Sequence, residues 1–452
     1  DKPDEEFDLV FDVKCDGWFN LLRAIGDMPL AATVAFSSIA GRFGNLGQTD
    51  YSAANDLLCK LSGALPATRG IAIDWTAWAD IGMASRGGIP AMMAQAGIDM
   101  LAPEAGIPFI RHELTAGSRR GEVVVAENLG VLMAERDPTG GLDTAVLGER
   151  LRGPMLGSVV GMNLHHGLQV ETTLSPDEQP FLYDHQIDGT PVLPGVMAME
   201  AFAEVAGLVF PELQVLCLDD VEFQAPLKFY RGEPQTLDLN ARFGMEQGQV
   251  VAYCRCASRR KLHGQEQEQV TTHFQATVRL GSEPLEAESA PVPAGTADRE
   301  LPAADLYRVY FHGPAYQVLS AAWLEDGKVV GRYAADLSPN HQPEDRPLVL
   351  PPREIEACFQ TAGSWEIGTT GKMALPRRIG RVSIYGGAPG HDGKLQAVVQ
   401  TREQGKVFDA VAVDGTGRVL VRLEGYESIE YPGTIEEPLL APFATVMAGV
   451  AR

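Results

Sequence analysis

The hydrophobic and polar positions of residues 1–135 follow two alternating periods. Apolar residues recur at helical spacing in "FDVKCDGWFNLLRAI" (11–25) and "TDYSAANDLLCKLSGAL" (49–65). Short apolar runs typical of buried strands are "AATVAFSS" (31–38), "RGIAIDW" (69–75) and "GEVVVAE" (121–127). Strands and helices in alternation form a parallel sheet with helices packed on it. We therefore expect an α/β unit that ends near residue 135.

A different pattern extends from about residue 163 to 432. One helix-like segment (195–206) precedes strand-like runs, and a second helix-like segment (353–368) is followed by further strand-like runs. This predicts the same α+β plan twice, over 163–285 and 305–432, which suggests duplication, although no residue-level repeat is evident. Segments of mixed or low-hydrophobicity composition predict linkers at 136–162 and 286–304 and an exit linker at 433–452.

Composition narrows the possible functions. The 452 residues carry 37 basic and 60 acidic side chains, a net charge of −23, which argues against nucleic-acid binding. One dense basic segment, "RCASRRKLHG" (255–264), is interpreted as solvated charge on a hairpin, with docking of an acidic carrier protein as the alternative. No leader and no membrane-spanning apolar run is visible, so we expect a cytoplasmic location and no membrane partner. The chain starts without Met, so we expect it to be part of a longer protein.

Motifs for metal or hydrolase chemistry are missing. Six cysteines form no CxxC pair, and the C-x-C of Cys254 and Cys256 offers only two ligands. "HELTA" at His112 breaks the HExxH pattern, and neither G-x-S-x-G nor a Walker loop occurs. We predict reduced core thiols and no metal.

The segment "VAFSSIAGRFGNLGQTDYSAAND" (34–56) contains the first candidate chemistry. Ser38 and Tyr51 hydroxyls can jointly hold a carbonyl oxygen, and a nearby ammonium such as that of Lys14 lowers a tyrosine pKa and eases proton delivery. Together with Asn55, one helical turn after Tyr51, these residues resemble the ketoreductase domains of type I polyketide synthases, a branch of the short-chain dehydrogenase/reductases. "IDWTAWADIGMAS" resembles their substrate lid. The alternative is that Ser38 caps and Tyr51 merely packs.

That resemblance implies a partial Rossmann-like fold, a catalytic tetrad of Lys14, Ser38, Tyr51 and Asn55, and NADPH for an intact ketoreductase. A nicotinamide cofactor needs a glycine-rich turn after the first strand. No G-x-G-x-x-G occurs in this segment, and we expect the cofactor half to precede Asp1. The tetrad is therefore predicted to be idle in this chain.

The second candidate site begins at "DHQIDGTPVLPG" (184–195). His185, Gly189 and Pro194 form an H-x-x-x-G-x-x-x-x-P pattern, and a helix follows from Gly195. Glycine permits close backbone approach, proline presets a first helical turn, and free helix N–H groups can face a thioester carbonyl. A histidine over that carbonyl can remove an α-proton. The pattern resembles dehydratase domains of polyketide and fatty acid synthases, which have a double hot-dog fold. A simple turn carrying a hydrogen-bonded histidine is the alternative.

The acid is sought on the second helix, in "PPREIEACFQTAG" (351–363). Where that family has a His-Pro-led segment ending in Asp, this chain has Pro351 and Glu356, with Gln360 one turn later. These departures look more like dehydratases of iterative polyunsaturated-fatty-acid and enediyne synthases. Apolar neighbours raise a carboxyl pKa, so Glu356 is predicted to be a general acid. Glu354, on another side of the helix, is the competing carboxylate.

A third segment, "YFHGPAYQVL" (310–319), resembles the family's Tyr-Gly-Pro loop. His312 stands in place of the tyrosine, and Gly313, Pro314 and Tyr316 are kept. The resemblance implies that this loop shapes the substrate channel and donates a hydrogen bond near the leaving hydroxyl. A purely structural turn is the alternative.

The resemblance as a whole implies a dehydratase. His185 would remove a C2 proton from a 3-hydroxyacyl thioester and Glu356 would protonate the departing hydroxyl, without a cofactor. Implied partners are an acyl carrier protein with its phosphopantetheine arm, other synthase domains and a second copy in a homodimer. Two alternatives stay open: an NADPH-dependent ketoreductase whose missing half is supplied elsewhere, and a non-catalytic hot-dog module that binds acyl chains.

Overall fold

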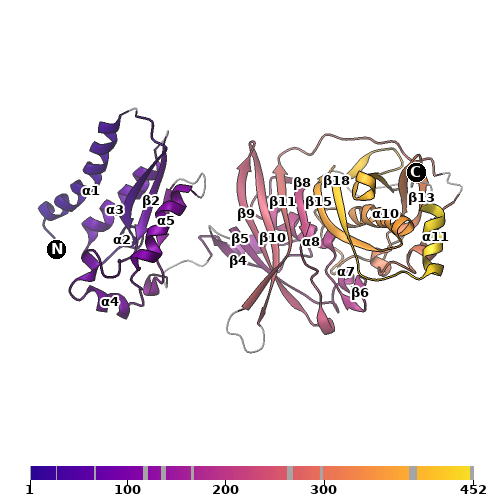
Figure 1. Cartoon of the computed structure of the whole chain (residues 1–452), viewed down its shortest axis with the longest axis horizontal. Helices are drawn as coiled ribbons and strands as arrows, with labels where there is room; N and C mark the ends of the chain where they lie inside the picture. Colours follow the sequence, from indigo (N-terminus) through magenta and orange to yellow (C-terminus); the bar gives the residue numbers. More distant parts are fainter. Residues whose placement is uncertain are drawn as a thin grey trace. The chain divides into compact units, whose positions relative to one another are not determined.

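The computed structural model describes residues 2–26, 28–65, 68–115, 121–133, 139–163, 167–261, 268–295, 299–385 and 394–447. The chain divides into two compact units, Asp1–Asp137 and Pro138–Arg452, and each is described by itself (Figure 1).

The first unit is built on a parallel sheet in the order β1–β2–β3. Helix α3 packs on all three strands, and α1 packs on α3. The predicted α/β arrangement is confirmed. The elements are β1 (Ala32–Ser38), β2 (Arg69–Trp75), β3 (Gly121–Val125), α1 (Asp4–Ile25), α2 (Ile39–Phe43), α3 (Thr49–Gly63), α4 (Ile89–Gln95), α5 (Pro103–Thr115), η1 (Met83–Ser85) and η2 (Gly130–Met133).

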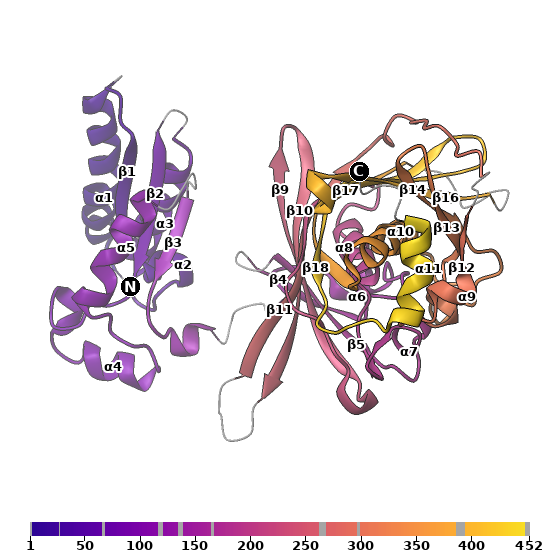
Figure 2. The same cartoon turned by 45° about the vertical axis from the view of Figure 1, so that its right-hand side comes forward.

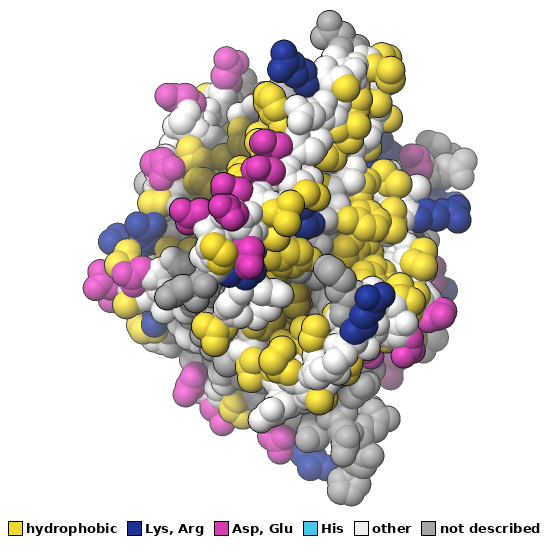
Figure 3. All heavy atoms as spheres, turned by 90° about the vertical axis from the view of Figure 1, so that its left-hand side faces the viewer, with side chains coloured by type: hydrophobic (Ala, Val, Ile, Leu, Met, Phe, Trp, Pro, Cys, Tyr) yellow, Lys and Arg dark blue, Asp and Glu magenta, His cyan; other side chains and the backbone are white. Residues whose placement is uncertain are grey.

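Large apolar side chains remain exposed on this unit. Leu9 and Val13, one turn apart on α1, are each more than half exposed, and so are Phe19 on α1 and Phe36 on β1. Figure 3 shows hydrophobic side chains gathered on one face of the molecule, with Asp and Glu side chains beside them.

The second unit contains one sheet of 13 strands among its described residues, in the order β12-β13-β14-β16-β17-β18-β15-β8-β11-β10-β9-β5-β4. Every pairing in this sheet is antiparallel. The first half wraps around helix α8 and the second around α10, and the halves meet where β8 pairs with β15 (Figure 1). The predicted double hot-dog plan, one helix and one antiparallel sheet twice, is confirmed.

The elements of the two halves follow the same order. The first half has β4 (Ser158–Asn163), β5 (Gly167–Leu174), α8 (Gly195–Gly207), β8 (Gln214–Phe223), β9 (Gln235–Glu246), β10 (Gln249–Lys261) and β11 (Glu268–Gly281). The second has β12 (Leu301–Pro302), β13 (Leu319–Glu325), β14 (Lys328–Tyr333), α10 (Pro352–Thr370), β15 (Ala374–Ile384), β16 (Gln396–Arg402), β17 (Val407–Val413) and β18 (Val419–Glu430). Short elements are α6 (Thr144–Gly148), α7 (Pro180–Tyr183), β6 (Gln186–Ile187), β7 (Thr190–Pro191), η3 (Tyr230–Gly232), α9 (Ala303–Leu306), η4 (Pro314–Tyr316) and η5 (Glu403–Gly405).

The junction between the halves is also held by charge. Asp219 on β8 accepts hydrogen bonds from Arg279 on β11 at 2.5 Å and from Arg381 on β15 at 2.6 Å. Two charge-assisted bonds to one carboxylate compensate for its partial burial. The pair of hot dogs is therefore one continuous body.

All three segments expected as linkers contain structured residues, and within 286–304 the fully buried Leu301 belongs to β12. Within 136–162, Met155 and Leu156 are buried in the core of the second unit and β4 starts at Ser158. Within 433–452, helix α11 (Glu437–Met447) packs on α10 and buries Phe443 and Met447. Helix α11 was not predicted because two prolines and an acidic start hide the helical spacing of its apolar side chains.

The remaining expectations from the sequence concern cysteine, charge and membrane. All six cysteines are buried and none is in a disulfide, as predicted. Of the basic segment 255–264, β10 holds the part up to Lys261, where Arg259 pairs with Asp238 at 2.7 Å, and 262–264 lie outside the described residues. Among the described helices, none has the length and hydropathy to cross a membrane.

Candidate active site

His185 lies between α7 and the short β6–β7 hairpin. Asp188 and Gly189 both have positive φ, which is the type I′ geometry of a two-residue hairpin turn and explains the glycine. Nδ1 donates a hydrogen bond to the Val192 carbonyl oxygen at 2.8 Å. Because a carbonyl can only accept, the neutral ring keeps its lone pair on Nε2. Burial, and then the nearby His312, lowers the pKa of His185 to about 4, so the ring is neutral at physiological pH.

Glu356 projects from α10 and is held at one oxygen. Its Oε1 accepts a hydrogen bond from Gln360 Nε2 at 3.0 Å and lies 3.1 Å from Nε2 of His312. Gln360 is itself fixed, because its Nε2 also donates to the Tyr316 carbonyl and its Oε1 accepts from the Tyr307 hydroxyl, both at 2.9 Å. The contact with Gln360 agrees with the sequence analysis, whereas the contact of the buried Glu356 carboxyl with His312 was not expected.

The loop carrying His312 is joined to the loop carrying His185. The two histidines form an isolated antiparallel bridge, and their ring centroids are 5.3 Å apart. Asp184 accepts from Gly313 N at its carbonyl (2.7 Å) and from Ala315 N at Oδ2 (2.8 Å). A Cβ on Gly313 would collide with Asp184, so glycine is required there.

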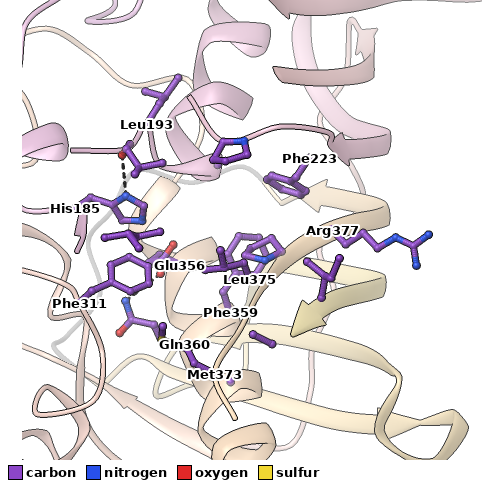
Figure 4. Close-up of a pocket in the computed structure, with 18 of the residues that line it drawn as sticks. His185, Leu193, Phe223, Phe311, Glu356, Phe359, Gln360, Met373, Leu375 and Arg377 are labelled. Atoms are coloured by element: carbon purple, nitrogen blue, oxygen red, sulfur yellow. Dashed lines mark hydrogen bonds between the residues drawn. The ribbon is translucent and has the colours of Figure 1, made fainter. Parts of the chain in front are cut away.

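These groups face one cavity of about 670 Å³ (Figure 4). Its polar side has His185, His312, Glu356 and Gln360. Aromatic and aliphatic side chains form much of the remaining wall, and Glu222, Gln224 and Arg378 also line it. Arg377 extends outward at one end, as Figure 4 shows. The apolar wall includes Leu193, Phe223, Phe274, Phe359, Leu375 and Tyr426.

The other predicted residues support this cavity from outside or at its edge. Gly195 lines it, and a Cβ there would collide with Phe223. Pro194 is the residue before the first turn of α8, and Tyr316 is buried with its ring 6.1 Å from that of His185. Gly189, Gly313 and Pro314 shape turns and are not among the lining residues. Glu354 is also buried but does not line the cavity.

Sequence reasoning missed several contributors. Asp184 stood beside His185 in the quoted motif, yet only the structure shows its two backbone partners. Phe311 stacks on His312 with centroids 4.4 Å apart and lies 5.0 Å from the His185 ring. The one feature of the sequence that could have indicated a role for Phe311 is its position next to His312.

The ketoreductase-like residues are only partly brought together. Lys14 Nζ lies 5.3 Å from the centre of the Tyr51 ring, and burial lowers the pKa of this lysine. Asn55 Nδ2 donates to the Tyr51 carbonyl at 2.7 Å. Ser38 Oγ accepts from Ala40 N and so caps helix α2, whereas the structural alternative considered from the sequence was that Ser38 caps a strand.

A nicotinamide cofactor does not fit the described part of the first unit. Its pyrophosphate needs a glycine-rich turn between a strand and a helix. After β1 the chain passes through Ser38 directly into α2. In the described residues, the glycines between β2 and α4 (Gly82, Gly87 and Gly88) lie well beyond the end of the strand, and β3 is followed by Ala126 and Glu127 rather than by glycine. The reaction proposed for this chain therefore includes no step through NADPH.

One group with metal-ligand atoms occurs among the described residues, although we predicted no metal. Cys59, Asp74 and Glu122 come from α3, β2 and β3, and their ligand atoms lie within 4.8 Å of one another. Cys59 Sγ donates to Asp74 Oδ1 at 3.3 Å. Burial raises the pKa of Asp74 to about 7 and that of Cys59 to about 12, so protons can satisfy this group.

Comparison with known protein families agrees with this geometry. The model "Polyketide synthase dehydratase domain" matches residues 153–252, "Polyketide synthase dehydratase N-terminal domain" matches 285–438, and "KR domain" matches 1–80. Among curated proteins, a polyunsaturated fatty acid synthase polypeptide of Thraustochytrium sp. is 26% identical over 449 residues, covering 90% of this chain and 14% of that protein. The spectinabilin polyketide synthase system protein NorB of Streptomyces orinoci is 35% identical over 159 residues, covering 34% and 7%. The chain thus spans a small part of these relatives.

Solved structures match the second unit. A trans-AT polyketide synthase dehydratase domain from Brevibacillus brevis superposes with a TM-score of 0.52 at 19% identity, covering 62% of this chain and 98% of that one. The dehydratase domain from the CurF module of the curacin polyketide synthase gives 0.51 at 20% identity, covering 62% and 99%. At these identities the similarity shows the fold.

Proposed function

The chain carries a polyketide synthase dehydratase domain behind part of a KR domain, and from this premise we propose that it removes water from a 3-hydroxyacyl thioester. His185 is the base and Glu356 the acid. The observation that supports these roles most directly is that the His185 ring keeps its lone pair on Nε2 and shares one cavity with Glu356. A dehydratase is a hydro-lyase and needs no cofactor for this step.

The reaction starts at C2 of the substrate. Nε2 of His185 takes the C2 proton, and the electron pair of that C–H bond becomes the second bond between C2 and C3. Negative charge develops on the thioester carbonyl oxygen, and the N-terminus of α8, which begins at Gly195 on the cavity wall, stabilises it. Low pKa at His185 keeps the base uncharged until the proton arrives.

The leaving group departs from C3. Oε1 of Glu356 already accepts from Gln360 and faces His312 Nε2, so Oε2 is the oxygen that protonates the C3 hydroxyl. The C3–O bond breaks and water leaves with that proton. His185 ends as an imidazolium and Glu356 as a carboxylate, and proton exchange with water restores both.

The rest of the cavity suits an acyl chain presented by a carrier protein. Its aromatic and aliphatic wall can accommodate a hydrocarbon tail. The thioester would arrive on a phosphopantetheine arm, with an acyl carrier protein, other synthase domains and a second copy of the chain as partners. Similarity to a polyunsaturated fatty acid synthase supports an iterative synthase of that kind. The poor fit of the first unit to NADPH disfavours ketoreduction by this chain.

Intact-protein mass spectrometry of a carrier protein loaded with a 3-hydroxyacyl chain tests the proposal. Wild-type protein should convert the chain to a species lighter by one water, and His185→Ala and Glu356→Gln should each abolish the conversion. Water loss that survives Glu356→Gln would move the acid to His312 or Glu354. No water loss with any chain length would favour the acyl-binding module.

A further inference from the structure

The helices at the centre of the two hot dogs carry matching residues. Between residues 185 and 207, seven identities recur at a constant offset of 156 residues: His185/His341, Gln186/Gln342, Pro191/Pro347, Glu200/Glu356, Ala201/Ala357, Ala206/Ala362 and Gly207/Gly363. Contrary to the expectation from the sequence, a residue-level repeat is therefore present, and it becomes evident once α8 and α10 are recognised as counterparts. Glu200 on α8 is the counterpart of Glu356 on α10.

The two glutamates are used differently. Glu200 is fully buried, and its two oxygens accept hydrogen bonds from Val349 N at 2.7 Å and Leu350 N at 2.8 Å. Both amides lie just before Pro352, where α10 begins. Glu200 therefore holds the start of the helix that carries Glu356, across 150 residues of sequence.

The corresponding backbone of the first half cannot hold Glu356 in this way. The counterparts of Val349 and Leu350 at the same offset are Leu193 and Pro194. Leu193 N donates to the Leu227 carbonyl at 3.0 Å, and Pro194 has no N–H. Glu356 consequently contacts Gln360 and His312 and faces the cavity, whereas both carboxyl oxygens of Glu200 accept hydrogen bonds from backbone amides.

We propose that Glu200 is a positioning residue: it anchors the Val349–Leu350 segment and thereby sets where α10 presents Glu356 to His185. The proposal rests on the dehydratase function proposed above. Helices α8 and α10 also pack on each other, so the anchor acts between elements already in contact (Figure 2).

A second acid supports this use of Glu200. Glu204, one turn later on α8, is hydrogen-bonded to Glu200 and accepts from Met155 N at 3.2 Å. Burial raises the pKa of both carboxyls and so favours their protonated forms. Burial of Glu200 beside Glu204 therefore does not require two full negative charges next to each other inside the domain.

The experiment compares Glu200→Ala with Glu204→Ala in the full chain. Both remove a buried carboxyl from the same helix and leave backbone N–H groups without an acceptor, but only the first frees the segment before α10. Two measurements are made: hydrogen exchange of the Val349 and Leu350 amides, and kcat and KM with a 3-hydroxydecanoyl carrier protein.

Glu200→Ala should speed exchange at both amides and lower kcat about 100-fold, the size of effect that a displacement near 1 Å produces, while KM is unchanged. Glu204→Ala, which keeps both amide acceptors of Glu200, should change exchange and kcat much less than Glu200→Ala does. Glu200→Gln, which keeps one acceptor, should fall between wild type and Glu200→Ala and serves if the alanine variant does not fold.

Three outcomes would overturn the proposal: unchanged exchange at Val349 and Leu350 in Glu200→Ala, equal kcat losses in the two alanine variants, or faster exchange with wild-type kcat. If wild-type protein itself releases no water, the proposed function fails. The exchange measurement then still decides whether Glu200 anchors the segment.

Discussion

Burial of the His185 ring has a direct kinetic consequence. Its pKa is lowered to about 4 from 6.5, so the ring stays neutral, and able to accept a proton, well below the usual range of histidine. We expect kcat/KM of dehydration to stay level between about pH 8 and about pH 5 as far as the base is concerned. A pH–rate profile on the carrier-bound substrate measures this. An acidic limb centred on pH 6.5 would contradict it and indicate a solvated ring.

The contact between His312 and Glu356 predicts a second kinetic effect. Replacing His312 by Phe removes the group 3.1 Å from Glu356 Oε1, and a hydrogen bond to the carboxylate that forms as Glu356 gives up its proton is worth about 1.5–3 kcal/mol. If that bond acts in the transition state, kcat falls about 10- to 100-fold. His312→Tyr, whose phenol can also donate, is the matched control and should retain more activity. Equal losses in both variants would assign packing alone to this position.

At the residue scale, the spacing of residues within the motifs predicted which side chains lie at the site, but not the hydrogen bonds that position them. The motif around His185 and the pair Glu356/Gln360 were found because each has a local signature. Asp184 was missed because its partners, Gly313 N and Ala315 N, are more than a hundred residues away. The contact of Glu356 with His312 was missed for the same reason, since His312 comes from a distant loop.

At the scale of elements, α11 yields a stability prediction. Phe443 is fully buried against the second hot dog, and truncation of a buried phenylalanine costs about 3–5 kcal/mol through lost burial and a residual cavity. Phe443→Ala should therefore lower the free energy of unfolding of residues 138–452 by that amount in urea titrations. Thr445→Ala, at an exposed position of the same helix, is the control. A change below about 1 kcal/mol would show that α11 is peripheral.

Elements with strong periodicity were predicted well. The helix expected over 195–206 is Gly195–Gly207, because Pro194 marks its start and the run is apolar throughout. Helix α11 was missed, since Pro438 and Pro442 look like helix breakers although the first lies in the initial turn. Strand order within the 13-stranded sheet could not be predicted, because it depends on pairings between distant segments.

At the scale of the whole second unit, buried acids predict how folding stability depends on pH. Burial raises the pKa of Glu366 to about 7 from 4.5. Above pH 4.5 the unfolded chain releases this proton while the folded chain keeps it. Stability is therefore full below about pH 4.5 and declines by about 3 kcal/mol as pH rises to about 7.

Urea denaturation at pH 5 and pH 8 measures this decline. Glu366→Gln keeps an acceptor for the Ser428 hydroxyl and removes the proton, so its stability should depend less on pH than that of wild type. The Glu200–Glu204 pair, with pKa values shifted in the same direction, leaves part of the slope in place. A wild-type protein more stable at pH 8 than at pH 5 would contradict the prediction.

The ladder between β8 and β15 has a further consequence for how this domain can be assembled. Five residue pairs from Arg378↔Glu222 to Ser383↔Cys217 join the halves, and the ion pair of Asp219 with Arg381 crosses the same seam. The connecting segment between Gly281 and Leu301 is not part of this ladder, although Glu288 within it pairs with Arg422 on β18. A protease nick there would leave a two-chain enzyme, and the two hot dogs, expressed as separate polypeptides, should reconstitute by complementation a site that neither holds alone.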